Sequence, residues 1–173
     1  MKYKIKAFFR RVYNLYRWLP VIWKDQDWDD WYIFEILKFK LKNQAEYISS
    51  HDRHVGAKRD AQIMMTCVRL IEKIQEEYYS GEYMEYHKAD YKWIDSSKYP
   101  DYYQLEIVET SERFDEYFKK YPHTHRKVLE NKNNIFRTEG KRVVAMNMGH
   151  MNEEKAHRIL FTLLERNIRR WWD

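Results

Sequence analysis

Residues 25–48 read DQDWDDWYIFEILKFKLKNQAEYI and predict the central helix of the fold. When they are spaced at about 100° per residue, the apolar side chains cover most of the helix surface. The polar stripe that remains consists of Glu35, Lys38, Lys42 and Glu46. A helix that is apolar on most sides normally packs against more than one neighbour, so we expect this one at the centre of a helical protein.

Other segments predict further helices around it. Helical periodicity runs from the N-terminus to Leu19, where Pro20 is expected to end the helix, and then over about Lys58–Tyr79, Gln104–Lys120, Pro122–Phe136 and Asn152–Trp172. With four Gly and three Pro, the chain is also poor in turn residues. The predicted fold class is therefore mostly α, a five- or six-helix bundle formed by a single domain of residues 1–173.

Two segments depart from the helical pattern. Residues 80–103 are crowded with Tyr and Trp and have almost no aliphatic side chains, which predicts a Tyr-rich excursion away from the core. Residues 141–148, KRVVAMNM, have the pattern of one strand without an evident partner strand. We therefore expect at most a minor strand in the fold.

The net charge of +5 is concentrated in residues 1–24. This arm holds seven of the 32 Lys and Arg residues and none of the 27 acids, which leaves the remaining residues with 25 basic against 27 acidic side chains. Its apolar residues fall on one arc of a helical wheel, with most of the bases opposite. We expect the arm to pack on the body and to leave its basic side for an anionic partner. Contact of residues 1–24 with an anionic membrane surface or a nucleic acid, or a role as an assembly protein, remains an alternative.

Several classes of protein are disfavoured by what the sequence lacks. No secretory signal and no run of about 18 uncharged apolar residues is evident, and the single cysteine, Cys67, falls on a core face. These features favour a cytoplasmic protein. The sequence has no nucleophile elbow, Gly-rich phosphate loop or paired-cysteine motif, so we expect neither an enzyme nor a cofactor.

The stretch HDRHVGAKRD, residues 51–60, is the first candidate site. It places His54, Lys58 and Arg59 at a predicted helix start, where cations are unfavourable unless something compensates them. An anion bound there would do so, and Gly56 permits an unusual turn of the backbone. In the structural alternative, Lys58 and Arg59 point to water and the inward-facing Asp60 ties the loop to the helix.

The stretch GHMNEEKAH, residues 149–157, is the second candidate. Glu153 and His157 lie four residues apart on the apolar arc of the last predicted helix. Together with His54 and Asp60 they would form a mixed nitrogen and oxygen metal site, and a metal-dependent hydrolase is the alternative function that follows. The spacing matches no established zinc signature, and an inward-facing His is more often hydrogen-bonded in a core than bound to a metal.

Four stretches in this order, WKDQDWDDWYIFEILKFKLK, HDRHVGAKRDA, EEYYSGEYMEY and RNIRRWWD, resemble a group of small uncharacterised helical proteins encoded by tailed bacteriophages. The resemblance covers about half of the chain, without residues 87–150, and implies action in the cytoplasm of a bacterial host. The matched polar positions are Asp27, Asp29, Glu35, His54, Gly56 and Asp60. They favour a site at the turn His54-Val55-Gly56, which we call the H-V-G turn. The resemblance implies no activity.

Taken together, these features favour a non-enzymatic accessory protein. Its partner would be an anionic small molecule or a host protein, and a nucleotide signal bound at His54, Gly56, Lys58, Arg59, Asp60 and Glu35 would make it a counter-defence factor. The sequence leaves a homo-oligomer open.

Overall fold

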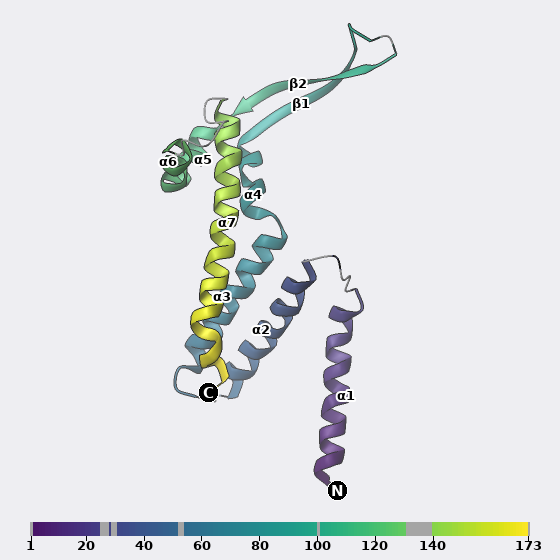
Figure 1. Ribbon diagram of the computed structural model, residues 1–173, viewed down its shortest axis with the longest axis vertical. Helices are drawn as coiled ribbons and strands as arrows, with labels where there is room; N and C mark the ends of the chain where they lie inside the picture. Colours follow the sequence, from purple (N-terminus) through teal and green to yellow (C-terminus); the bar gives the residue numbers. More distant parts are fainter. Residues whose placement is uncertain are drawn as a thin grey trace. The chain divides into compact units, whose positions relative to one another are not determined.

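The computed structural model describes residues 2–24, 28, 31–51, 54–99, 101–130 and 140–172 (Figure 1). The elements are α1 (Lys2–Ile22), α2 (Trp31–His51), α3 (Ala57–Gln75), α4 (Tyr78–Gly81), the 3₁₀ helix η1 (Glu82–Tyr86), β1 (His87–Asp95), β2 (Tyr103–Glu112), α5 (Phe114–Lys120), α6 (Pro122–Glu130), α7 (Lys141–Asn167) and the 3₁₀ helix η2 (Ile168–Trp172). The chain is mostly helical, which confirms the predicted class. None of the described helices is long and apolar enough to cross a membrane.

The chain, for which the sequence predicts one domain, divides into two compact units. Unit 1 comprises Met1–Gln75 and Leu160–Asp173, and unit 2 comprises Glu76–Ile159. Each unit has its own buried apolar residues, and we describe the two separately.

The centre of unit 1 is the helical hairpin of α2 and α3 (Figure 1). Its helices bury Leu41, Ala45, Ile48, Ala57, Ala61, Met64, Cys67, Val68, Ile71 and Ile74. On α3 these positions recur every three or four residues, which is the spacing that places side chains on one helix face. The helix predicted within residues 25–48 is therefore present from Trp31, but it buries fewer apolar side chains than expected, since Ile33 and Tyr47 on it are exposed.

The C-terminal turn belongs to the same unit. Trp171 in η2 is buried, and its backbone carbonyl accepts a hydrogen bond of 3.2 Å from Nε2 of Gln44 on α2.

Helix α1 extends three residues beyond the predicted end at Leu19. Pro20 lies inside it, and the N–H of Trp23 still donates to the carbonyl of Leu19 at 2.9 Å. Since Pro20 lies near the end of the helix, little of the backbone ladder depends on its missing N–H. The arm contacts α2 through Arg17, which donates to Asn43, and through Trp18, whose ring lies edge-on to Phe39 with the centroids 4.7 Å apart. Most of the other apolar residues of the arm, expected from the sequence to pack on the body, are exposed in the structure.

The core of unit 2 consists of Phe114, Tyr117, Phe118, Val128, Val144, Ala145 and Met148, with Tyr83, Tyr86, Tyr121 and Met151 packed against it. Helix α7 approaches α4 closely at Gly149, where a Cβ atom would lie 2.8 Å from the carbonyl oxygen of Ser80. A buried carboxylate, Glu82, pairs with Lys120 and accepts a hydrogen bond of 2.6 Å from the hydroxyl of Tyr121.

The prediction of a helix over Gln104–Lys120 is wrong in its first half. Residues Tyr103–Glu112 form β2, which pairs antiparallel with β1 from Asp95↔Tyr103 to His87↔Glu112, with a register shift between Lys88 and Ala89. Only Phe114–Lys120 is helical. The reason is that β pairing depends on a partner strand distant in the sequence, which local periodicity does not reveal.

The predicted strand over residues 141–148 is also wrong, because this stretch forms the first two turns of α7. The β-branched Val143 and Val144 suggested a strand. In the structure Val144, Ala145 and Met148 share one helix face and pack into the core of unit 2, and this packing outweighs the local propensity. Asp27, Asp29 and Phe136, which entered the sequence predictions, lie outside the described residues.

Candidate functional site

The turn before α3 is organised around the carboxylate of Asp60. This side chain is 2% exposed, and its Oδ2 lies 3.0 Å from Nε2 of His54. Arg59 donates to Oδ1 from both Nε and Nη2 at 3.2 Å. Gly56 adopts φ +99°, a left-handed conformation that a residue with a Cβ rarely takes, and its carbonyl accepts the N–H of Asp60 at 3.0 Å. The arrangement ties the loop to the helix, as in the structural alternative above.

The electrostatics of the turn are consistent with an ionised Asp60. Burial alone would raise the pKa of this carboxyl, but the hydrogen bonds from His54 and Arg59, together with the charges of Arg59 and Arg170, hold the pKa below its ordinary value. Asp60 thus supplies the negative charge that the helix start and its cations require. An external anion is not needed at this position.

Lys58 does not take part in this cluster. It lies at the rim of a groove of about 550 Å³ between α2 and α3, which is lined by Lys42, Ala45, Glu46, Ser49, Lys58, Ala61, Gln62, Met65 and Arg69. We call this the α2–α3 groove. Its volume is within the range typical of sites for small molecules.

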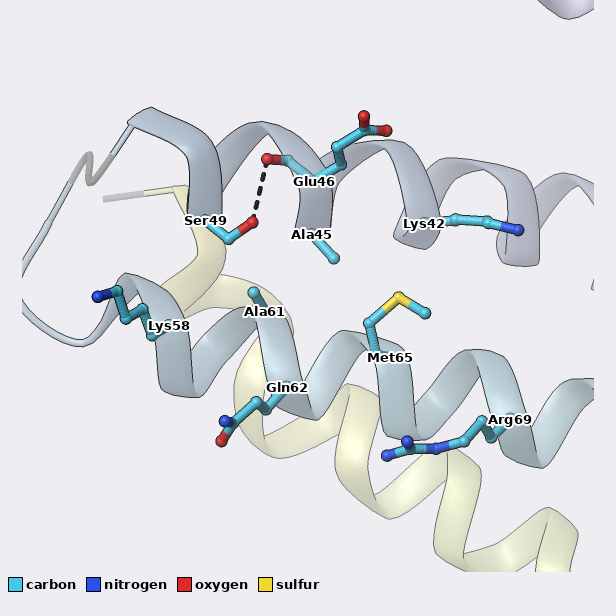
Figure 2. Close-up of a pocket in the computed structure, with 9 residues that line it drawn as sticks. All are labelled: Lys42, Ala45, Glu46, Ser49, Lys58, Ala61, Gln62, Met65 and Arg69. Carbon is cyan, nitrogen blue, oxygen red and sulfur yellow. Dashed lines mark hydrogen bonds between the residues drawn. The ribbon is translucent and has the colours of Figure 1, made fainter.

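Figure 2 shows how the lining residues are arranged. Ala45 of α2 and Ala61 of α3 point toward each other, and Met65 reaches toward α2. These small or flexible apolar side chains form the floor. Lys58 stands at one end of the row and Arg69 at the other, while the carboxylate of Glu46 points away from α3. The groove therefore combines an apolar floor with cations along its rim.

The cations of the groove are free of carboxylate partners within the described part of the chain. Lys42, Lys58 and Arg69 are exposed, and none of them forms an ion pair there; Arg69 donates only to Oγ1 of Thr66, at 3.2 Å. Three cations against the single carboxylate of Glu46 give the groove an excess of positive charge. A positive rim of this kind attracts an anion.

Glu35, which was predicted to share a site with His54 and Asp60, lies near the other end of the helical hairpin. It pairs with Lys38, whose Nζ also donates to Oε1 of Gln75 at 2.7 Å, close to the C-terminus of α3. The 16 residues that separate Glu35 from His51 span roughly 24 Å of helix. Glu35 is therefore not part of the turn at His54.

The proposed metal ligands form two separate pairs. His54 is bound to Asp60 in unit 1, and in unit 2 Nε2 of His157 lies 3.5 Å from Oε1 of Glu153. Burial is the main cause that raises the pKa of Glu153, although His157 opposes it. Among the described residues, no three His, Cys, Asp or Glu side chains lie close enough together to hold a metal ion. We therefore derive no metal chemistry from these four residues.

Unit 2 has a cavity of its own, of about 600 Å³, lined by Asp115, Phe118, Lys119, Pro122, His125, Arg126 and Leu129. The rings of Phe118 and His125 stack there with their centroids 4.3 Å apart. Arg126 lies 3.9 Å from Glu130, and the cavity also includes the carboxylate of Asp115. Asp115 and Glu130 thus offset most of the positive charge of this cavity, whereas the α2–α3 groove has one carboxylate for three cations.

Of the residues that line the groove, only Lys58 was predicted from the sequence to belong to a site. The signal for the others is the spacing along the two helices: Lys58, Gln62, Met65 and Arg69 follow one another by four, three and four residues, which places them on one face of α3. On α2, the groove residues follow one another by three, one and three residues, which also places them on one helix face: Lys42, Ala45, Glu46 and Ser49. Which face of α2 meets this face of α3 is not evident from either pattern alone.

No protein-family model matches the chain, and no curated protein or solved structure matches it either.

Proposed function

We propose that this protein is a non-enzymatic accessory protein that binds a small anionic ligand in the α2–α3 groove. The observation that supports this function is the set of three cations, Lys42, Lys58 and Arg69, around a floor of Ala45, Ala61 and Met65. In the described part of the chain no carboxylate is paired with these cations, so an incoming anion does not have to displace an internal partner.

The chemistry of the groove suggests what the ligand contains. Lys and Arg both bind phosphate or carboxylate, and the guanidinium of Arg69 can do so with two parallel hydrogen bonds. The thioether of Met65 is suited to contact with an aromatic ring, and the two alanines leave room for a flat group. A nucleotide combines both parts, an anionic group and a planar base.

The phage resemblance gives this proposal a biological setting, which is itself a prediction. A phage protein that sequesters a nucleotide signal of its bacterial host would act as a counter-defence factor. The groove, rather than the H-V-G turn, is the place where we expect such a signal to bind.

Isothermal titration calorimetry of the folded protein tests the proposal. The panel contains linear and cyclic nucleotides, inorganic pyrophosphate, and uncharged nucleosides for comparison. The groove variant Lys58→Ala/Arg69→Ala is compared with Lys127→Ala/Lys155→Ala, which removes two exposed cations from unit 2. We expect the groove variant to bind at least about ten-fold more weakly, since hydrogen bonds to charged groups contribute about 1.5–3 kcal/mol each.

Two results would exclude the groove as the binding site. One is the absence of heat with every anionic compound in the panel. The other is equal weakening by the two double variants, because it would show that overall charge rather than the groove determines the affinity.

A further inference from the structure

Helix α1 presents an apolar face to solvent. Within the described part of the chain nothing covers it, and its members are between 42% and 74% exposed: Ile5, Phe8, Phe9, Val12, Leu15, Tyr16 and Leu19. We call these residues the α1 arc. Contiguous exposed apolar surface of this kind usually marks a site of interaction with another protein or with a membrane.

The α1 arc does not face α2. At about 100° per residue, Arg17 and Trp18, which contact α2, fall on the side of α1 opposite the centre of the arc. The contacts that hold α1 in unit 1 therefore leave the arc free. Trp23, just after the helix, is 80% exposed.

Positive charge accompanies this apolar face. Residues 1–24 contain seven basic and no acidic side chains, and the exposed Lys4 and Arg11 adjoin the arc on the wheel. Long basic side chains beside an apolar face can extend their apolar stems along that face while their charged ends reach toward anions.

We propose that α1 binds the surface of an anionic lipid bilayer, with the α1 arc entering the boundary between headgroups and acyl chains. An amphipathic helix with bases on its polar side and Phe and Leu on the other has the chemistry of an interfacial helix. The lipid phosphates attract Lys4 and Arg11, and Trp23 is a residue type that favours the headgroup level.

Other partners satisfy only part of this pattern. A second copy of the chain would bring two helices of uniformly positive charge together, and like charges across an interface are unfavourable. A nucleic acid would neutralise the bases but would leave the α1 arc in water. An anionic bilayer accommodates both the charge and the apolar surface.

Sedimentation of the full chain with vesicles tests the inference. One set of vesicles is phosphatidylcholine, and the other contains in addition a quarter of phosphatidylglycerol. The arc variant is Phe8→Ser/Leu15→Ser, and the charge variant is Lys4→Glu/Arg11→Glu. Lys127→Glu/Lys155→Glu changes the net charge equally at exposed positions of unit 2 and serves as the control.

We expect the unaltered chain to bind the anionic vesicles at least about ten-fold more tightly than the neutral ones, because polybasic segments are attracted to anionic lipid. The arc variant and the charge variant should each bind the anionic vesicles at least about ten-fold more weakly than the unaltered chain. The control and the groove variant Lys58→Ala/Arg69→Ala should keep their affinity for these vesicles. Circular dichroism and thermal unfolding verify that each variant is folded. Retention by the groove variant separates this inference from the proposed function.

Three results would overturn the inference: no binding of the unaltered chain to anionic vesicles, equal binding of the arc variant, or dimerisation that the arc variant abolishes. Hydrogen exchange of the unaltered chain provides a test without substitutions. We expect anionic vesicles to slow exchange in peptides from residues 2–24. Slowing confined to other peptides would also contradict the inference.

Discussion

The imidazole of His54 and the carboxylate of Asp60 lie 3.0 Å apart across the turn that begins α3. Their contact joins the loop after α2 to the first turn of α3, and Arg59 completes it from the other carboxylate oxygen. Asp60 is buried, so the free energy of unfolding should depend on these partners. The same turn also positions Lys58 at the rim of the α2–α3 groove.

Replacing Asp60 by Asn should destabilise the protein by about 1–3 kcal/mol at neutral pH, because the hydrogen bonds to His54 and Arg59 lose their charged acceptor. The folded-state pKa of Asp60 is lowered, so its stabilising contribution is complete above the unfolded pKa of about 3.9 and is lost as pH falls through the folded value. Urea unfolding at neutral and acidic pH measures both effects.

The control for this experiment is Asp90→Asn on the exposed part of β1. We expect a change within about 0.5 kcal/mol for it. Equal stabilities of Asp60→Asn and Asp90→Asn at neutral pH would show that the turn does not depend on the Asp60 charge.

Gly149→Ala should destabilise unit 2 by about 1–3 kcal/mol, because the added Cβ would lie 2.8 Å from the Ser80 carbonyl oxygen and 3.3 Å from that of Tyr79. Both neighbours are backbone atoms and cannot rotate away. Gly81→Ala is the matched control, since nothing lies within 4 Å of a Cβ there and its φ is −93°. A neutral or slightly stabilising effect is expected for it. Thermal unfolding distinguishes the two, and a harmless Gly149→Ala would contradict the close approach of α7 and α4.

Tyr121→Phe should lower the free energy of unfolding by about 1.5–3 kcal/mol, since the buried carboxylate of Glu82 would lose a hydrogen bond of 2.6 Å. Burial, and after it the hydrogen bond and charge of Glu82, raise the pKa of the Tyr121 phenol, which therefore stays a donor throughout the physiological range. Tyr99→Phe, at an exposed tyrosine, is the control. If the two variants unfold at the same urea concentration, the Glu82 contact contributes nothing measurable.

Cys67 should be unreactive in the folded protein. It is fully buried, and burial raises the pKa of its thiol to about 11, so both access and the thiolate fraction are low. A chromogenic disulfide reagent should label it rapidly in concentrated urea and far more slowly in native buffer. Equal rates in the two conditions would contradict its place in the core of unit 1.

The helices of unit 1 could be predicted because their apolar residues recur with the helical period. The core face of α3 followed from this period, and Cys67, which the sequence places on it, is buried in the structure. The β1–β2 pairing could not be predicted from the sequence. Trp93 and Leu105 face each other only in one register of the two strands, and the local sequence does not specify that register.

The candidate site was only partly predictable, for a related reason. The odd position of Asp60 on an apolar face was evident from periodicity, and His54 and Arg59 were near it in the sequence. The groove requires a particular pairing of two helix faces, so Met65 and Arg69 acquire a shared role with Lys42 only when α2 and α3 are packed.

Methyl NMR of the full chain, titrated with each anion of the calorimetric panel, tests the central claim most directly. We predict that at least one anion shifts the methyl signals of Ala45, Ala61 and Met65 in a saturable manner, while the exposed Met84 of unit 2 stays unchanged. An uncharged nucleoside should leave all four signals in place. If every anion leaves the three groove methyls unmoved, or if the shifts fall only outside the groove, the protein does not bind its ligand between α2 and α3.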